Sequence, residues 1–196
     1  MLFNNNKRKI NFFSIQIIFL NYLKCNLYYL ISKLRIKYLD LEVQVSSWNI
    51  YPVLTFLKKN NQTQFQILID ITVYDILNQY ERFIVVYSLL SQSFNRRIYI
   101  ITKTNEITPL ISVNSLFCVS NWIEREIWDF FGILFFLHKD LRRILTDYGF
   151  DNYPLRKDFP LTGLFETMYD DNQKRIVNKR LLNLSQEYRV FNLDFN

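Results

Sequence analysis

Large apolar residues recur at every second position over nine residues in the middle of the chain. They are Phe65, Ile67, Ile69, Ile71 and Val73. Because successive side chains of a β-strand point to opposite faces, this spacing directs one face of a strand toward a hydrophobic core. A single strand cannot bury its own apolar face, so the chain must build a sheet around this segment.

Further strands are expected on both sides of this one. Residues 82–90 and 98–102 are rich in β-branched and aromatic side chains, and the Asn-Arg-Arg run at 95–97 between them suits a hairpin turn. Residues 41–45 read Leu, Glu, Val, Gln and Val, an alternation that indicates one more short strand. The sequence therefore predicts a sheet of three or four strands.

Helical spacing precedes these strands. Apolar residues of the N-terminal part recur in steps of three and four, which is typical of an amphipathic helix. They are Ile10, Phe13, Ile17, Leu20, Leu23, Leu27, Leu30 and Leu34. Residues 49–59 also fit a helix, with Pro52 tolerated in its first turn.

The N-terminal third of the chain is basic. Nine Lys and Arg residues within 1–59 face only Asp40 and Glu42, whereas the remainder is close to neutral. Such a segment suits RNA, an anionic lipid surface or an acidic partner, or it is the solvated face of an ordinary helix. We expect residues 1–40 to form a basic amphipathic N-terminal helix.

The apolar part of this segment is too short to cross a membrane. Residues 10–23 hold 14 uncharged positions before Lys24, whereas a spanning helix needs roughly 20 predominantly apolar residues. Asn11 and Asn21 also interrupt the stretch, which argues against a secretory signal. No transmembrane helix is expected.

A third helix is expected at 120–132. Asn121 is a candidate N-cap, Glu124 stands three residues later as in a capping box, and Gly132 suits the left-handed position after the last turn. Arg125 and Asp129 are spaced as an i,i+4 ion pair. Residues 41–132 are thus expected to form the α/β core domain.

Periodicity fades after Gly132. Residues 133–196 are irregular in pattern yet rich in aromatic residues, which is unlike a disordered tail. Ordering a residue costs roughly 1 to 2 kcal/mol of backbone entropy, so such an extension needs extensive burial. We expect this extended C-terminal tail to lie partly against a partner protein.

The sequence lacks the usual cofactor motifs. Its three glycines are too far apart for a Rossmann or P-loop phosphate site, and its two cysteines, Cys25 and Cys118, are too few for an iron–sulfur cluster. His138 is the only histidine and could act as an acid or base beside Asp140, Asp129 or Glu126, but the sequence indicates no Ser-His-Asp triad. No catalytic, cofactor-binding or metal-binding residue is predicted.

Several charged and aromatic blocks resemble a known family. Residues 124–133 read Glu-Arg-Glu-Ile-Trp-Asp-Phe-Phe-Gly-Ile, and His138, Asp140 and the run Leu-Arg-Arg-Ile-Leu at 141–145 follow. Together with the blocks at 146–150, 154–161 and 186–191, they resemble the thirty-kilodalton subunit family of mitochondrial respiratory complex I. The sequence departs from the family pattern at Lys139, at Asn152-Tyr153 and at Asn178-Lys179.

This resemblance implies an α+β fold, with a mixed sheet flanked by helices and a long irregular C-terminal extension that wraps partner subunits. It implies a core subunit on the matrix side of the mitochondrial inner membrane, in the quinone module of the peripheral arm. The partners would be the 49 kDa quinone-site subunit and the small terminal-cluster subunit, with no nucleic acid. FMN, iron–sulfur clusters and ubiquinone would belong to partner subunits.

The resemblance also places the subunit interface in the region 120–160. The residues expected there are Glu124, Arg125, Glu126, Asp129, His138, Asp140, Arg142, Arg143, Arg156, Lys157 and Asp158.

A different reading starts from composition. The chain contains no alanine and is rich in Asn, Ile, Phe, Tyr and Lys, as AT-rich codons favour, so an organellar gene is expected. With the basic N-terminal third, this composition leaves an RNA-binding organellar ribosomal protein as the alternative.

Overall fold

The computed structural model describes residues 16–37 and 40–181. The expected helical positions Ile10 and Phe13 and the family block at 186–191 lie outside the described residues. Within the described ranges, no helix is both long enough and apolar enough to cross a membrane.

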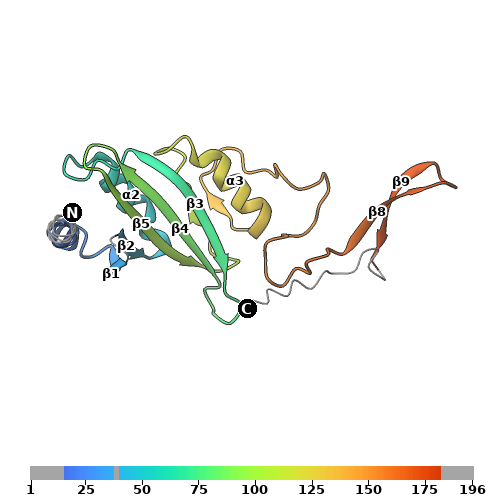
Figure 1. The fold of residues 1–196 in the computed structure, drawn as a ribbon, viewed down its shortest axis with the longest axis horizontal. Coiled ribbons are helices and arrows are strands. Elements are labelled where there is room, and N and C mark those ends of the chain that lie inside the picture. The colour runs from blue at the N-terminus through green and yellow to red at the C-terminus, as the bar shows by residue number, and fades with distance from the viewer. Residues whose placement is uncertain (1–15, 38–39, 182–196) are drawn as a thin grey trace, which may run out of the picture.

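A five-stranded mixed sheet forms the centre of the protein, in the order β1-β2-β5-β4-β3 (Figure 1). Only β2 and β5 run parallel; the other neighbours are antiparallel. The strands are β1 (Ile31–Lys37), β2 (Asp40–Val45), β3 (Ile67–Asp75), β4 (Phe83–Ser91) and β5 (Arg96–Thr104). The predicted strands at 41–45, 65–73, 82–90 and 98–102 are confirmed, with small shifts of their ends.

The β4–β5 hairpin is also confirmed, although its turn lies at 92–95, and Arg96 and Arg97 already belong to β5. Asn95 takes a positive φ of 48°, a conformation that asparagine tolerates better than most residues. Parallel pairing of β2 with β5 needs a crossover. The short 3₁₀ helix η1 (Ser47–Asn49) and the predicted helix α2 (Ile50–Lys59) begin it.

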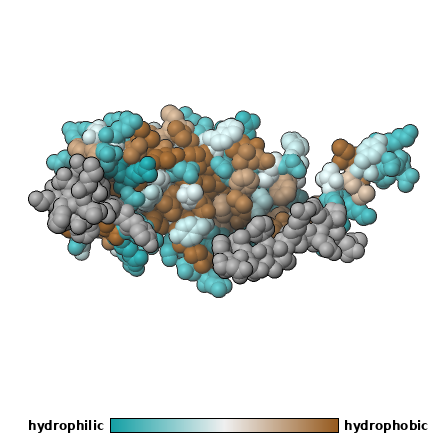
Figure 2. Space-filling view, in the orientation of Figure 1, coloured by the Kyte–Doolittle hydropathy of each residue, from teal (hydrophilic) through white to brown (hydrophobic). Residues whose placement is uncertain are grey.

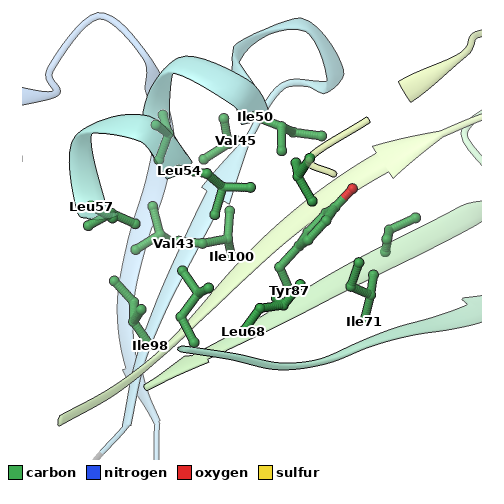
Figure 3. Close-up of a cluster of buried hydrophobic side chains, with 14 of the residues drawn as sticks. Val43, Val45, Ile50, Leu54, Leu57, Leu68, Ile71, Tyr87, Ile98 and Ile100 are labelled. Atoms are coloured by element: carbon green, nitrogen blue, oxygen red, sulfur yellow. The ribbon is translucent and has the colours of Figure 1, made fainter. Parts of the chain in front are cut away.

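The core lies between one face of the sheet and the helices. Val43 and Ile100 from the sheet meet Leu54 and Leu57 from α2, and all four are buried (Figure 3). Burying such a side chain contributes roughly 1.5 to 3 kcal/mol. The helix at 16–26 adds Phe19, whose ring centroid lies 6.2 Å from that of Phe65.

The prediction of one helix through Leu34 is wrong. The helix ends at residue 26 and the chain then forms β1, in which Leu34 and Ile36 face Val43 and Leu41 of β2. Leu30 and Leu34 fit a four-residue helical step, but Leu34 and Ile36 also fit the two-residue step of a strand. Pairing with β2 decides for the strand, so β1 belongs to the sheet; the three-domain division stays a prediction.

Helix α3 (Ser120–Phe131) packs against β3 beside a small parallel pair, β6 (Leu110–Ile111) and β7 (Phe135–Phe136). Gly132 ends the helix with a φ of 74°, as predicted. The predicted capping box is wrong, because the N-cap residue is Val119 and no side chain caps the helix. Glu124 instead accepts hydrogen bonds from residues that precede the helix.

Residues 137–164 contain no helix or strand and run along the domain near α3. The expected irregular tail is wrong for residues 165–180, because β8 (Phe165–Asp170) and β9 (Arg175–Arg180) form an antiparallel hairpin that projects from the domain (Figure 1). Almost all of its side chains are exposed, so it lacked the buried apolar stripe by which a strand is recognised. The predicted α+β class with a mixed sheet is confirmed.

Candidate functional site

The predicted interface residues gather where α3 meets the segment 137–158. Glu124 of α3 is fully buried. Its Oε2 accepts the Ser112 hydroxyl at 2.6 Å and its Oε1 accepts the Val113 amide at 2.9 Å. Burial raises the pKa of Glu124, and the hydrogen bonds from Ser112 and Val113 oppose that shift. This carboxyl therefore ties α3 to the strand end after β6.

His138 lies against the same carboxyl. Its side chain has no solvent exposure, and its Nε2 is 3.8 Å from Glu124 Oε2 and 3.3 Å from the Asn121 carbonyl. The Asp140 amide donates to Nδ1 at 3.2 Å, so Nδ1 is an acceptor and the ring proton belongs on Nε2. The ring therefore fixes the start of the segment through Asn121 and Asp140, rather than pairing with Asp129 or Glu126 as an acid–base group would.

Asp129, one turn further along α3, is also fully buried. Its oxygens accept the Thr146 hydroxyl at 2.6 Å, the amides of 144, 145 and 146 at 3.2, 2.8 and 2.9 Å, and Arg143 Nη1 at 3.2 Å. Burial alone would raise the pKa of Asp129, but the hydrogen bonds from Thr146 and its neighbours hold the pKa below its ordinary value. The ionised carboxylate thus holds residues 144–146 against α3.

Arg143 completes this network. Its guanidinium donates to the Asn152 carbonyl at 2.9 Å and lies 5.1 Å from the Tyr153 ring and 5.4 Å from the Trp128 ring. Such cation–π contacts add about 0.5 to 2 kcal/mol, depending on desolvation. The expected Arg125–Asp129 pair is wrong, because Asp129 binds Arg143 while Arg125 binds Asp140 at 2.9 Å.

A second cluster surrounds Arg82, which sequence reasoning missed. Arg82 binds Asp75, reaches Glu106 at 2.6 Å and reaches Asp158 at 3.2 Å. The hydrogen bond from Arg82 lowers the pKa of Asp75, whose Oδ2 also accepts the Lys157 amide at 3.0 Å. Asp75 and Asp158 are far apart in sequence, so no local pattern announces this contact.

Arg156 pins the segment to the end of α3. Its Nε donates to the Phe131 carbonyl at 2.6 Å, its Nη1 lies 3.3 Å from Glu106, and its guanidinium stacks 4.4 Å from the Tyr153 ring. A Cβ at Gly132 would come within 2.5 Å of Arg156 and 2.7 Å of Tyr153. Gly132 is therefore required both for its positive φ and for this close approach.

The structure separates the predicted interface residues into two groups. Glu124, Asp129 and His138 have buried side chains and act inside the chain, and Arg125, Arg143 and Arg156 are mostly covered. Asp140, Arg142, Lys157 and Asp158 are exposed, and Glu126 is partly exposed. A direct partner contact stays a prediction for the second group.

Among the residues that the structure describes, no three His, Cys, Asp or Glu side chains are grouped to hold a metal ion. Cys25 and Cys118 are both exposed and unpaired with each other.

We call the buried network around Glu124, Asp129 and Arg82 the charged clasp, because it holds residues 138–158 on the α/β domain.

A family profile described as the 30 Kd subunit of the respiratory-chain NADH dehydrogenase matches residues 43–164. The chain belongs to this family. The matched range takes in the second half of β2, the strands β3, β4 and β5, α3 and the whole charged clasp. The resemblance seen in the sequence is thereby confirmed.

Relatives within the family are closely similar. "NADH-ubiquinone oxidoreductase subunit 9" of Reclinomonas americana is 48% identical over 153 residues, which covers 78% of this chain and 74% of the relative. An NADH-quinone oxidoreductase subunit of Chelativorans is 51% identical over 156 residues, covering 80% and 78%. "NADH dehydrogenase [ubiquinone] iron-sulfur protein 3" of Oryza sativa is 51% identical over 142 residues, covering 72% and 74%.

Solved structures share the fold. A trypsin-resistant fragment of Nqo5 is 29% identical, with a TM-score of 0.50, and the match covers 56% of this chain and 89% of the fragment. A chain from an archaeal membrane-bound sulfane sulfur reductase is 23% identical, with a TM-score of 0.63 over 76% of this chain and 86% of that one. The second likeness shows the fold alone.

Proposed function

We propose that this 30 kDa-family chain is a non-catalytic core subunit of a mitochondrial NADH:ubiquinone oxidoreductase. It would lie in the quinone module of the peripheral arm, on the matrix side of the inner membrane. There it would contact the 49 kDa quinone-site subunit and the small terminal-cluster subunit. The names of the relatives support the complex, and those from a plant and a protist support the mitochondrion.

One observation carries the scaffolding role. The charged clasp fixes residues 138–158, yet large apolar side chains next to it point to solvent. Leu155 is 52% exposed, Leu161 is 88% exposed, and Tyr148 is fully exposed. A chain gains little by ordering such a segment for its own stability, because the apolar area stays in water. The order is useful when a neighbouring protein of the complex covers these residues.

The same reasoning applies to the β8–β9 hairpin. An isolated two-stranded hairpin is marginally stable in water. Phe165, Tyr169 and Ile176 lie on one face of it, and each is more than half exposed. We therefore propose that the hairpin and the segment before it wrap a neighbouring subunit.

The chain's own residues do not fit a redox cofactor. The rice relative is named an iron–sulfur protein, but a cluster generally needs four cysteine ligands and this sequence has two cysteines. We propose that FMN, iron–sulfur clusters and ubiquinone are bound by partner subunits. Electron transfer would then depend on this chain only through the positions of its neighbours.

The alternative of an RNA-binding ribosomal protein gains no support from the family match or from the relatives. A native gel distinguishes the two proposed functions. Mildly solubilised mitochondrial membranes are resolved, the chain is located by mass spectrometry, and the gel is stained for NADH dehydrogenase activity. We expect the chain in the large active band; migration with ribosomal RNA, or alone, would overturn the proposal.

A variant tests the scaffolding role itself. Arg143→Ala removes the cation that binds Asp129 and the Asn152 carbonyl, so we expect less assembled complex on the same gel. Lys59→Ala, an exposed position on α2, is the control and should assemble normally. A normal amount of complex with a slowed quinone step in Arg143→Ala would contradict a purely structural role.

A further inference from the structure

The sheet is apolar on both faces, although only one face packs into the core. In β4, Phe83, Val85, Tyr87 and Leu89 point to the core, and the residues between them point to the opposite side, which we call the outer face. Apolar residues of β4 and β5 on the outer face lie outside the core cluster. They are Ile84, which is buried, and Val86, Leu90, Tyr99 and Ile101, which are partly exposed.

This composition is unusual for a sheet with one face in water. Antiparallel strands with a solvated face normally alternate apolar and polar residues, whereas strands covered on both faces read as nearly continuous apolar runs. β4 reads Phe-Ile-Val-Val-Tyr-Ser-Leu-Leu-Ser, a run of the second kind. Yet α2 lies behind β4 and β5 in Figure 1, and no described helix lies on the side toward the viewer, which is a mainly brown surface in Figure 2.

The strand register places charges around this apolar centre. On the β1 edge of the outer face stand Lys33 and Arg35, which align with Gln44 and Glu42 of β2. The next strands continue these rows through Ile101 and Tyr99. On the β3 edge the same face carries Asp70, opposite Ser88. The outer face is therefore apolar in its middle, with Lys33 and Arg35 along β1 and the single carboxylate Asp70 at β3. Arg97 and Lys103 of β5 lie at its two ends.

We propose that the outer face is a second docking surface, covered by an amphipathic helix of a neighbouring subunit whose apolar stripe lies on β4 and β5. Carboxylates on one flank of that helix would face Lys33 and Arg35, and basic residues on the other flank would face Asp70. A helix is the element that ordinarily covers the open face of a sheet. The carboxylates of Glu42 and Asp70 disfavour an anionic lipid surface as the occupant.

This inference rests on the proposed function, since it needs an assembled complex. The purified complex is treated with a carbodiimide, which joins a lysine amine to a carboxylate in direct contact, and cross-linked peptides are sequenced. We expect Lys33 or Lys103, both on the outer face, to join Asp or Glu of a helix in another subunit. Lys59 on α2, on the opposite layer, reports general reactivity.

Other cross-linking results overturn the inference in distinct ways. Links to Glu187 or Asp194 would mean that the chain's own C-terminal residues cover the face. Links between two copies of the chain would mean a homotypic contact. Reactive Lys59 with no links from Lys33 or Lys103, in a complex that contains the chain, would leave the proposed function standing and remove the docking surface.

Variants provide the second test. Val86→Asp puts a charge in the apolar centre and should lower the amount of chain in assembled complex at least about tenfold. The double variant Lys33→Gln with Arg35→Gln changes only exposed side chains and puts no new carboxylate opposite Glu42, so it should leave the fold intact and still reduce assembly. Lys59→Gln is the matched control. Normal assembly of both outer-face variants, or tight binding of the isolated chain to anionic vesicles, would contradict the proposal.

Discussion

In the sheet domain, the large apolar side chains pack against one another out of contact with solvent, as Phe65, Tyr87 and Leu54 do. In the segment 138–164, comparable side chains such as Leu155 and Leu161 are exposed. This segment is held to the domain by charged contacts, those of Arg143 with Asp129 and of Asp158 with Arg82. Apolar packing is non-directional and supports a fold by its total area, whereas hydrogen-bonded charges act at particular atoms. Apolar packing thus stabilises the domain, whereas charged hydrogen bonds fix the position of the segment on it.

The largest effect on stability is expected from a substitution in the core of the sheet domain. Leu54→Ala leaves a cavity beneath α2 and should lower the free energy of unfolding by about 3 kcal/mol, as such truncations do. Urea denaturation followed by circular dichroism measures this. Leu161→Ala, at an exposed position, should change the unfolding free energy by less than about 0.5 kcal/mol. Equal effects of the two variants would contradict the division between domain and segment.

A substitution at Asp129 tests how the segment 138–158 is held. Asp129→Asn removes the charge that collects three backbone amides and Arg143, so the segment should detach while the sheet stays folded. The free energy of local opening at the amides of 144–146 should fall by about 2 kcal/mol, so their hydrogen exchange should become roughly 30-fold faster. Exchange in β4 and β5 should not change. Asp147→Asn, an exposed neighbour, is the control. Faster exchange throughout the sheet would mean that the clasp supports the whole domain.

Glu124 offers a smaller, pH-dependent test. Burial raises its pKa above the unfolded value of 4.5, so the folded state disfavours ionisation. Stability lent by the neutral carboxyl is complete below pH 4.5 and declines as the pH rises toward the folded pKa. Relative to Glu124→Gln, the wild type should lose at most about 1.4 kcal/mol per pH unit over that window.

Unfolding free energies of the two proteins, measured at several pH values, check this slope. A constant difference would mean that Glu124 has the same pKa in both states. An increase in wild-type stability with pH would mean that the folded state lowers the pKa of Glu124, so that the hydrogen bonds from Ser112 and Val113 outweigh burial.

The sequence allowed prediction of the elements whose pattern reflects burial. Strand β3, helix α2 and the β4–β5 hairpin show their periodicity because one side of each faces the core. Gly132 was predictable because few other residues adopt its φ of 74°. The β8–β9 hairpin gave no such signal, since its two faces are both exposed in the chain alone.

The charged clasp was only half predictable. Asp129 and Arg143 stood out as charges, but their pairing depends on a chain reversal 14 residues long that local rules do not encode. Glu124 was assigned to a capping box three residues from Asn121, whereas its partners Ser112 and Val113 precede the helix. The contact of Arg82 with Asp75 and Asp158 is not predictable from a local pattern, because Asp158 lies 76 residues away from Arg82. Tertiary contact overrode local pattern in each case.

We infer that residues 165–180, beyond the clasp, are ordered by contact with a partner. Amide hydrogen exchange of β8 and β9 tests this inference when the isolated chain is compared with the assembled complex. We expect fast exchange of residues 165–180 in the isolated chain, slow exchange in the complex, and slow exchange of β4 and β5 in both. Equal protection of the hairpin in the two states would contradict this inference, because the hairpin would then be stable without a neighbour.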